Sequence, residues 1–548
     1  MPETNSIPTL DQAAQLQRAA VELSELALTR SREVTAGGKR IDDHQVLVER
    51  VVYAATQARA VTELVEAVSG AAAEGRASQT LELCAVAGVA ELVGGVRARL
   101  ELVAHDLGLE ESELDAVFPA ELRALLRGCG HESVFRALGR QVCEARGAND
   151  WPLDELCEQV REAVRGFAES EVMPEAERIH RTDAGIPESF IRGMAELGYF
   201  GLPVPEVYGG SELGNLAMIL TTEELSRASL AAAGSLITRP EILTKALLGG
   251  GTEAQKQHWL PRLASGELMV GISVTEPDVG SDVASVKCRA ERRGDAWLLN
   301  GPKAWCTFAG RADVLAVLAR TDSSPDSGAR GLSLFIVPKQ AFEGHEFEFV
   351  QPGGGRLVGK ADATRGYRGM HSFTLNFEDF EVPADHLVGG DEGEGRGFYL
   401  QMAGFAAGRL QTGGRACGLA QAALEKTAQY VVDRVQFGQA ISDYQLTQFT
   451  LGRMAALLAA SRALTYAAAD AMDGDERAAA PLAAQAKLLA CDMAVEVTQQ
   501  GQLMHGGWGY AEEYPISRYV VDAQVLPIFE GVKPILELKV VGRALLAG

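Results

Sequence analysis

The chain has 548 residues, more than one hydrophobic core usually serves, which predicts two to four packed units. Apolar residues make up 47% of the chain and charged residues 23%, a balance that excludes a disordered, collagen-like or mucin-like protein. The 74 acidic and 51 basic residues give a formal net charge of −23. This charge repels phosphate backbones and anionic lipids, so neither nucleic acid nor a membrane is expected as a partner.

Targeting and cysteine patterns favour a reducing cell interior. Residues 1–5 lack the basic-then-apolar pattern of an export signal, and no apolar run approaches the roughly 18–20 residues of a membrane span. The eight cysteines show no C-x-x-C spacing, which argues against a disulfide framework and against a zinc ribbon. We therefore expect a cytoplasmic protein without a metal site.

Residues 1–148 predict a helical bundle, because apolar residues recur at three- and four-residue steps along 16–26, 47–68 and 81–100. Glycine-containing turns separate these stretches. We expect a domain boundary just before Pro152. Helical patterning then continues through a second expected domain, residues 149–268.

Residues 269–392 predict a β domain, because short runs rich in valine, leucine and phenylalanine alternate with turns. The runs cover residues 285–290, 296–300, 313–319, 332–337 and 373–377. Residues 393–548 return to long helices. The expected fold is therefore mainly α with a central antiparallel β domain and an extra N-terminal helical bundle. The absence of repeated β–α alternation argues against a doubly wound dinucleotide-binding sheet.

Three segments carry candidate chemistry, although each alone also suits an ordinary turn, a helix end or a solvated surface. Residues 273–282, with Trp305 and Thr307, offer hydroxyls and backbone amides beside a flat aromatic ligand. Residues 434–445 combine an arginine that could bind phosphate with a phenylalanine that could stack. Near the C-terminus, Glu530 lies between an aromatic residue and glycine, where desolvation would raise its pKa and make it a competent base.

Together these segments resemble the acyl-CoA dehydrogenase family of flavoenzymes, over about residues 152–548. The resemblance rests on four motifs in the family's order: Thr275-Glu276-Pro277 through Asp282, Trp305-x-Thr307, Arg434-x-x-Phe437-Gly438 and Phe529-Glu530-Gly531. It implies the family's α–β–α architecture, FAD as cofactor, an acyl-CoA substrate and electron-transfer flavoprotein as acceptor.

The resemblance also implies a role for each matching residue. Glu530 would be the catalytic base that removes the substrate α-proton. The flavin end of FAD would contact Val274, Thr275, Trp305 and Thr307. A neighbouring subunit of a homodimer or homotetramer would supply contacts from Arg434, Phe437, Gln445 and Gly507. Acyl-CoA would contact Ser281, Arg409, Phe529 and Gly531.

Within the family, the N-terminal extension and the segments 238–242, 355–357, 366–372 and 528–531 resemble an enzyme whose acyl chain is short, branched and ends in a carboxylate. This resemblance implies (2S)-methylsuccinyl-CoA as substrate, oxidised to mesaconyl-CoA. A buried carboxylate needs a cation, and Arg239 would lie at a helix N-terminus opened by Pro240, unless it simply pairs with a surface carboxylate. The alternatives are an uncharged branched acyl-CoA of the isobutyryl or 2-methylbutyryl type, an acyl-CoA oxidase, or a non-catalytic assembly scaffold.

Overall fold

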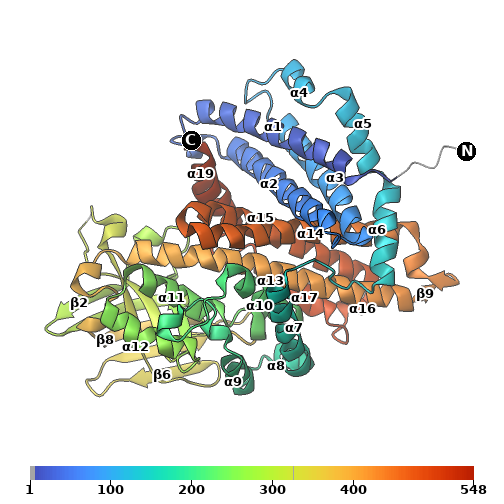
Figure 1. The fold of residues 1–548 in the computed structure, drawn as a ribbon. Coiled ribbons are helices and arrows are strands. Elements are labelled where there is room, and N and C mark those ends of the chain that lie inside the picture. Colours follow the sequence, from blue (N-terminus) through green and yellow to red (C-terminus); the bar gives the residue numbers. More distant parts are fainter. Residues whose placement is uncertain (1–6, 325, 548) are drawn as a thin grey trace, which may run out of the picture. The chain divides into compact units, whose positions relative to one another are not determined.

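The computed structural model describes residues 7–324 and 326–547, so residues 1–5, used above to argue against an export signal, lie outside it. The described chain forms two compact units (Figure 1). The first combines residues up to Glu158 with residues from Thr412 onward, and the second is the continuous segment between them.

The N-terminal part of the first unit is the predicted bundle. Its helices are α1 (Leu10–Val34), α2 (Gln45–Ala73), α3 (Gln79–Glu101), α4 (Glu111–Val117), α5 (Ala120–Cys129) and α6 (Glu132–Glu144). Thr9 starts α1 as a capping box with Gln12, which satisfies backbone N–H groups that a helix start leaves without partners. Apolar faces of α2 and α3 are buried, as their periodicity predicts.

The C-terminal part of the same unit is also helical. It contains α13 (Gly397–Asp433) from Thr412 onward, α14 (Gln445–Gly474), α15 (Glu476–His505), α16 (Gly507–Tyr510), α17 (Ile516–Ala523), α18 (Lys533–Ile535) and α19 (Arg543–Leu546). A short hairpin, β9 (Val435–Gln436) with β10 (Gln439–Ala440), separates α13 from α14.

Helix α6 of the extension packs closely on α14. A Cβ atom added to Gly139 would lie 1.8 Å from the carbonyl oxygen of Gln448. A Cβ atom added to Gly452 would lie 2.0 Å from the carbonyl oxygen of Phe135. Glycine is therefore required on both helices, because any side chain there would separate the two backbones.

By length and composition alone, helix α15 could cross a membrane. The sequence predicted no apolar run of that length. However, 72% of its apolar window is buried inside the first unit, and burial in a helical core accounts for this composition.

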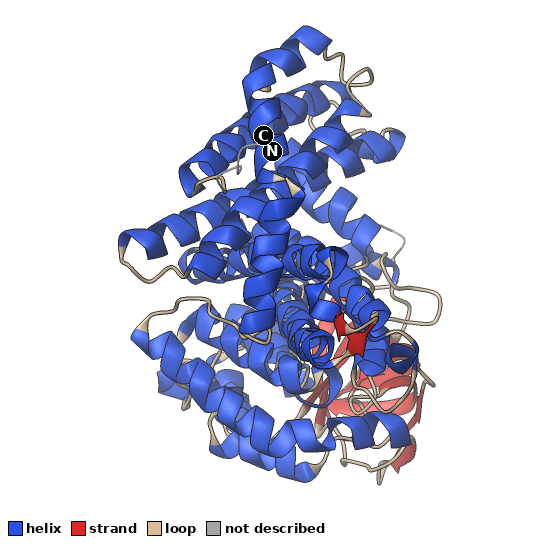
Figure 2. Cartoon of the chain, turned by 90° about the vertical axis from the view of Figure 1, so that its right-hand side faces the viewer, coloured by secondary structure: helices blue, strands red, loops and turns tan. Residues whose placement is uncertain are grey.

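The second unit carries the β domain and the helices before it. The helices are α7 (Glu155–Phe167) from Gln159 onward, α8 (Met173–Thr182), α9 (Glu188–Glu196), α10 (Gly214–Ala228), α11 (Thr238–Gly250) and α12 (Glu253–Ala264). The strands, drawn in red in Figure 2, are β1 (Val270–Ser273), β2 (Arg289–Arg293), β3 (Ala296–Thr307), β4 (Val314–Arg320), β5 (Leu332–Pro338), β6 (Glu346–Val350), β7 (Arg356–Ala361) and β8 (Ser372–Pro383).

The predicted central β domain is confirmed, and its mainly antiparallel sheet also contains parallel pairs of strands. Its order is β1-β4-β2-β3-β8-β7-β6, with β5 paired to β4, and β1 runs parallel to β4 with Val270 opposite Val314. The β2–β3 hairpin lies between β1 and β4 in the chain, which gives the length that a parallel crossover needs. The strand expected at residues 285–290 begins only at Arg289, and Val283–Ser285 form a 3₁₀ turn before it.

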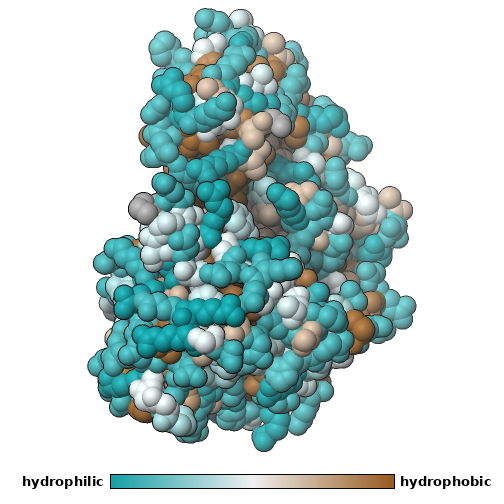
Figure 3. All heavy atoms as spheres, turned by 90° about the vertical axis from the view of Figure 1, so that its left-hand side faces the viewer, coloured by the Kyte–Doolittle hydropathy of each residue, from teal (hydrophilic) through white to brown (hydrophobic). Residues whose placement is uncertain are grey.

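Strands β4 and β5 form the centre of the second unit's core, with helices α11 and α12 packed against it. On the face shown in Figure 3 the protein surface is mostly hydrophilic, and apolar side chains occur in small scattered groups. This agrees with a strongly charged chain whose apolar residues lie in helical and sheet cores.

Candidate active site

The turn after β1 is held in place by a buried ion pair. Glu276 accepts hydrogen bonds from the backbone N–H of Cys288 at 2.7 Å and from Lys303 Nζ at 3.0 Å. Lys303 also donates to the carbonyl oxygen of Val274 at 3.0 Å. Val274 is buried and Thr275 is half-buried. The turn thus has a fixed backbone at the two residues predicted to meet the flavin.

Strand β3 brings the predicted aromatic and hydroxyl groups to the same turn. The backbone N–H of Ala304 donates to the carbonyl oxygen of Thr275 at 2.8 Å. The register of β3 against β8 shifts between residues 303 and 306, and Trp305 within this bulge has φ 56° and a side chain 59% exposed. The second unit therefore assembles Thr275 and Trp305 at one place.

Thr307, two residues further, lies at the end of β3. Its Oγ1 is 3.0 Å from Ser372 Oγ at the start of β8, so the hydroxyl is fixed by a neighbour. An exposed indole with a hydroxyl on the same strand suits a flat heteroaromatic ring that needs one face covered and one hydrogen-bond partner. These residues fit the isoalloxazine of FAD. Ser281, predicted to contact acyl-CoA, is exposed in the turn before β2.

Arg239 is the second residue of α11, and only 5% of it is exposed. Its Nη2 lies 3.5 Å from the hydroxyl of Tyr367. Arg239 is therefore an interior residue, whereas the surface-pairing alternative needs an exposed one. Arg409, the other predicted substrate arginine, is half-buried on α13 in the same unit.

The loop that carries Glu530 belongs to the first unit and has a left-handed backbone. Glu530 has φ 54° and is half-buried, and Gly531 follows with φ 101°. Lys487, on α15 and 1% exposed, donates from Nζ to the carbonyl oxygens of Phe529 and Gly531, both at 2.5 Å. The fully buried Arg415 lies with Cζ 4.8 Å from the centre of the Phe529 ring. Two buried cations therefore fix the residues on either side of Glu530.

The residues predicted to meet the distal part of FAD lie on the surface of the first unit. Arg434, Gln445 and Gly507 are exposed, and Phe437 is 96% exposed with φ 52° in the β9–β10 turn. A phenylalanine ring with nearly all of its surface in solvent is unfavourable in an isolated chain, so a ligand or a second subunit is expected to cover it.

Sequence reasoning did not identify Lys487, Arg415 or the Glu276–Lys303 pair as supports of the site. For Lys487 a signal was present, because a lone lysine inside the apolar stretch of α15 has to find buried acceptors. The contacts of Lys487 with residues 42 and 44 positions later could not be read from a local pattern.

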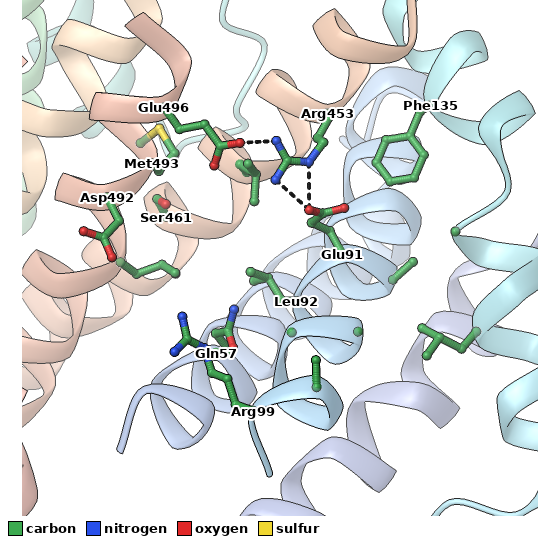
Figure 4. Close-up of a pocket in the computed structure, with 18 of the residues that line it drawn as sticks. Gln57, Glu91, Leu92, Arg99, Phe135, Arg453, Ser461, Asp492, Met493 and Glu496 are labelled. Carbon is green, nitrogen blue, oxygen red and sulfur yellow. Dashed lines mark hydrogen bonds and ion pairs between the residues drawn. The ribbon is translucent and has the colours of Figure 1, made fainter. Parts of the chain in front are cut away.

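A cavity of about 890 Å³ lies elsewhere in the first unit (Figure 4). Helices α3, α14 and α15 contribute Glu91, Arg453 and Glu496, and Arg453 pairs with both carboxylates. None of the predicted catalytic, cofactor or substrate residues lines this cavity. The cavity is therefore separate from the residues predicted to act in catalysis or to bind FAD and acyl-CoA.

Family models cover most of the chain beyond the extension. The N-terminal domain of acyl-CoA dehydrogenases matches residues 154–267, the middle domain residues 271–380 and the C-terminal domain residues 395–546. Among curated proteins, (2S)-methylsuccinyl-CoA dehydrogenase of Cereibacter sphaeroides is 40% identical over 428 residues, which cover 78% of this chain and 74% of that protein.

Solved structures agree with these matches. Butyryl-CoA dehydrogenase of Megasphaera elsdenii is 30% identical with a TM-score of 0.66, over 73% of this chain and all of that chain. A glutaryl-CoA dehydrogenase of Mycobacterium smegmatis in complex with FADH2 is 25% identical with a TM-score of 0.63, over 72% of this chain and 95% of that chain.

The helical, sheet and helical segments match the fold of flavin-dependent oxidoreductases, one of them solved with FADH2. The three domain matches make the class more specific, because they occur in the family's order with little chain between them. The chain belongs to the acyl-CoA dehydrogenase family. It is an FAD-dependent acyl-CoA dehydrogenase, as its motifs predicted.

Proposed function

We propose that this protein oxidises (2S)-methylsuccinyl-CoA to mesaconyl-CoA. The main support is the 40% identity to the Cereibacter sphaeroides enzyme over 78% of the chain. The interior position of Arg239 adds a chemical reason, because a substrate that ends in a carboxylate needs a buried cation.

In this proposal Glu530 removes the α-proton of the thioester. That proton is a weak acid, so the reaction needs a base held in one position rather than a mobile carboxylate. Lys487 provides this by fixing the carbonyl oxygens on both sides of Glu530. The bound FAD supplies the acceptor for the hydride that leaves the β-carbon.

In this proposal Arg239 binds the distal carboxylate of the substrate. Its place in the first turn of α11 adds the positive end of the helix dipole to the guanidinium charge. Tyr367 lies beside the guanidinium and would help to orient it. A planar arginine can bind a carboxylate through two parallel hydrogen bonds, which an uncharged acyl chain cannot form.

The test is anaerobic titration of the FAD-loaded protein with (2S)-methylsuccinyl-CoA, 2-methylbutyryl-CoA and isobutyryl-CoA, followed by flavin bleaching. Bleaching at stoichiometric methylsuccinyl-CoA, with little response to the other two, is the expected result. Preference for an uncharged branched thioester would contradict the proposed substrate. Peroxide release without an added acceptor would indicate an oxidase, and a protein that cannot be loaded with FAD would indicate a scaffold.

Arg239→Met tests the specificity argument. We expect KM for methylsuccinyl-CoA to rise by about 10- to 100-fold, since a lost charged hydrogen bond costs about 1.5–3 kcal/mol, while KM for 2-methylbutyryl-CoA changes little. Tyr367→Phe is the milder companion variant. An equal rise for both substrates would remove Arg239 from the carboxylate site.

We further propose that the protein is a cytoplasmic homodimer or homotetramer that passes electrons to an electron-transfer flavoprotein. The exposed Phe437 and Gln445 support the oligomer, because their predicted ligand is FAD held by a neighbouring subunit. Sedimentation of the holoprotein tests the assembly, and reduction of a purified electron-transfer flavoprotein tests the acceptor.

A further inference from the structure

Three side chains of metal-ligand type converge in the second unit, outside the residues assigned to catalysis. They are Asp183, His345 and His371, and one ligand atom from each lies within 4.8 Å of the others. His345 Nε2 is 3.0 Å from His371 Nε2, and His371 Nε2 is 3.1 Å from Asp183 Oδ1. The proposed function gives no role to any of these three side chains.

The three residues come from distant parts of the chain. Asp183 is the C-terminal cap of α8, His345 directly precedes β6, and His371 directly precedes β8. Asp183 and His371 have φ of 53° and 36°, a backbone region that residues other than glycine rarely adopt. Both strained positions place their side chains in the same cluster.

Hydrogen bonds alone account poorly for this arrangement. An imidazole Nε2 carries either one proton or one lone pair, yet each Nε2 here has two polar neighbours. His371 Nε2 faces His345 Nε2 and Asp183 Oδ1, while His345 Nε2 also lies 3.1 Å from the Asp183 carbonyl oxygen. Two nitrogens bound to one tetrahedral ion at about 2.1 Å would lie about 3.4 Å apart, so the observed 3.0 Å would have to widen by only a few tenths of an ångström.

We propose that Asp183, His345 and His371 bind a divalent transition-metal ion of the zinc type. Two imidazoles and one carboxylate are a ligand set that zinc accepts, and water would complete the coordination. Asp183 and His345 are partly exposed, so an ion can enter from solvent, whereas His371 is buried and anchors the site. This differs from the sequence-based expectation of no metal site, which considered only local cysteine and histidine motifs.

Arg368 is the one neighbouring cation that the described ion pairs place near the cluster, with Nε 3.5 Å from Asp183 Oδ1. Its closer contacts are to backbone oxygens, at 3.1 Å to Thr364 and 3.1 Å to His180. The backbone therefore fixes this guanidinium, which orients the carboxylate rather than replacing the ion.

The ion would connect the end of α8 to the start of β8, beside the flavin-facing hydroxyl. The carbonyl oxygen of His371 accepts from Phe308 N–H at 2.8 Å, and the next residue, Ser372, contacts Thr307. The ion therefore has a structural role, and its presence does not depend on which acyl-CoA is the substrate.

The experiment uses the FAD-loaded protein, treated with chelator, exposed to Zn²⁺ and freed of excess ion by gel filtration. The variants are Asp183→Asn, His345→Asn and His371→Asn, since asparagine tolerates the positive φ at two of these positions. His105→Asn, an exposed histidine of the first unit, is the matched control. Flavin absorbance and melting temperature verify that each variant is folded.

We expect about one zinc per chain in the wild type and in His105→Asn, and at least ten-fold weaker binding in the three cluster variants. Zn²⁺ should raise the melting temperature only where the site is intact. Co²⁺ added in place of Zn²⁺ should give visible absorption that the His345→Asn variant lacks. No retained zinc in the wild type, or equal zinc in wild type and folded cluster variants, would show a hydrogen-bonded cluster only and overturn the proposal.

Discussion

Replacement of Lys487 by methionine separates positioning of Glu530, the proposed base, from stability of the fold. Methionine keeps most of the length of the side chain but removes both 2.5 Å hydrogen bonds to the loop around Glu530. Hydrogen bonds from a charged donor contribute about 1.5–3 kcal/mol each, yet removal of a buried charge returns several kcal/mol of desolvation cost. We therefore expect the free energy of unfolding to fall by no more than about 3 kcal/mol.

Catalysis should respond more strongly than stability. The left-handed backbone at Glu530 is held by these bonds, and a displacement of about 1 Å in a reacting group can lower the rate about 100-fold. The assay is kcat and KM with an acyl-CoA substrate and an artificial acceptor, at equal FAD content. We expect kcat to fall by about two orders of magnitude in Lys487→Met.

Lys533→Met is the matched control. Lys533 is a half-buried lysine close to the same loop, but its Nζ binds Asp492 at 2.5 Å rather than the loop carbonyl oxygens. Such a partly exposed ion pair contributes about 0–1 kcal/mol. Equal kcat values for the two variants, or a Lys487→Met enzyme within about two-fold of wild type, would refute the positioning role, because a displaced base cannot leave the rate intact.

Glu530→Gln should lower kcat by about 10²- to 10⁴-fold while FAD stays bound, as stopped-flow flavin reduction can show; a fast variant would exclude Glu530 as the base. Gly139→Ala should destabilise the first unit by about 1–3 kcal/mol or more in urea unfolding. Gly128→Ala, in α5 with open space around its Cβ, should be neutral or stabilise by up to about 1 kcal/mol, and equal effects would contradict the α6–α14 contact. Burial raises the pKa of Glu537 to about 7, so the folded protein keeps a proton that the unfolded chain loses above about pH 4.5. The free energy of unfolding of the protein should then fall by up to about 3 kcal/mol between pH 4.5 and 7. Glu537→Gln should remove this dependence on pH, and an unchanged dependence would show that other groups cause it.

The order of helices and sheet could be predicted from the sequence, because local periodicity reports which face of each element is buried. The pairing of β1 with β4 could not, since parallel neighbours are chosen by contacts across the sheet rather than by the pattern within a strand. The same limit applies to the bulge at Trp305, where a register shift turns the side chain outward.

In the candidate site, too, local motifs predict some residues, while contacts between distant residues could not be predicted. Motifs in the sequence predicted Glu530 and Thr307 as site residues, but they gave no indication of how the positions of these residues are fixed. The supports come from distant residues, such as Lys487 on α15 and Ser372 on β8. The Asp183 cluster is an extreme case, because its aspartate lies 188 residues from His371 and no spacing rule connects them.

The discontinuous first unit has a consequence for synthesis on the ribosome. Helix α6 has its packing partner in α14, which is translated only after the whole β domain. The apolar face of α6 in the nascent bundle therefore stays uncovered while the middle of the protein is synthesised and folds. Chaperone dependence during translation, and poor solubility of fragments that stop before α14, are the expected costs of this arrangement.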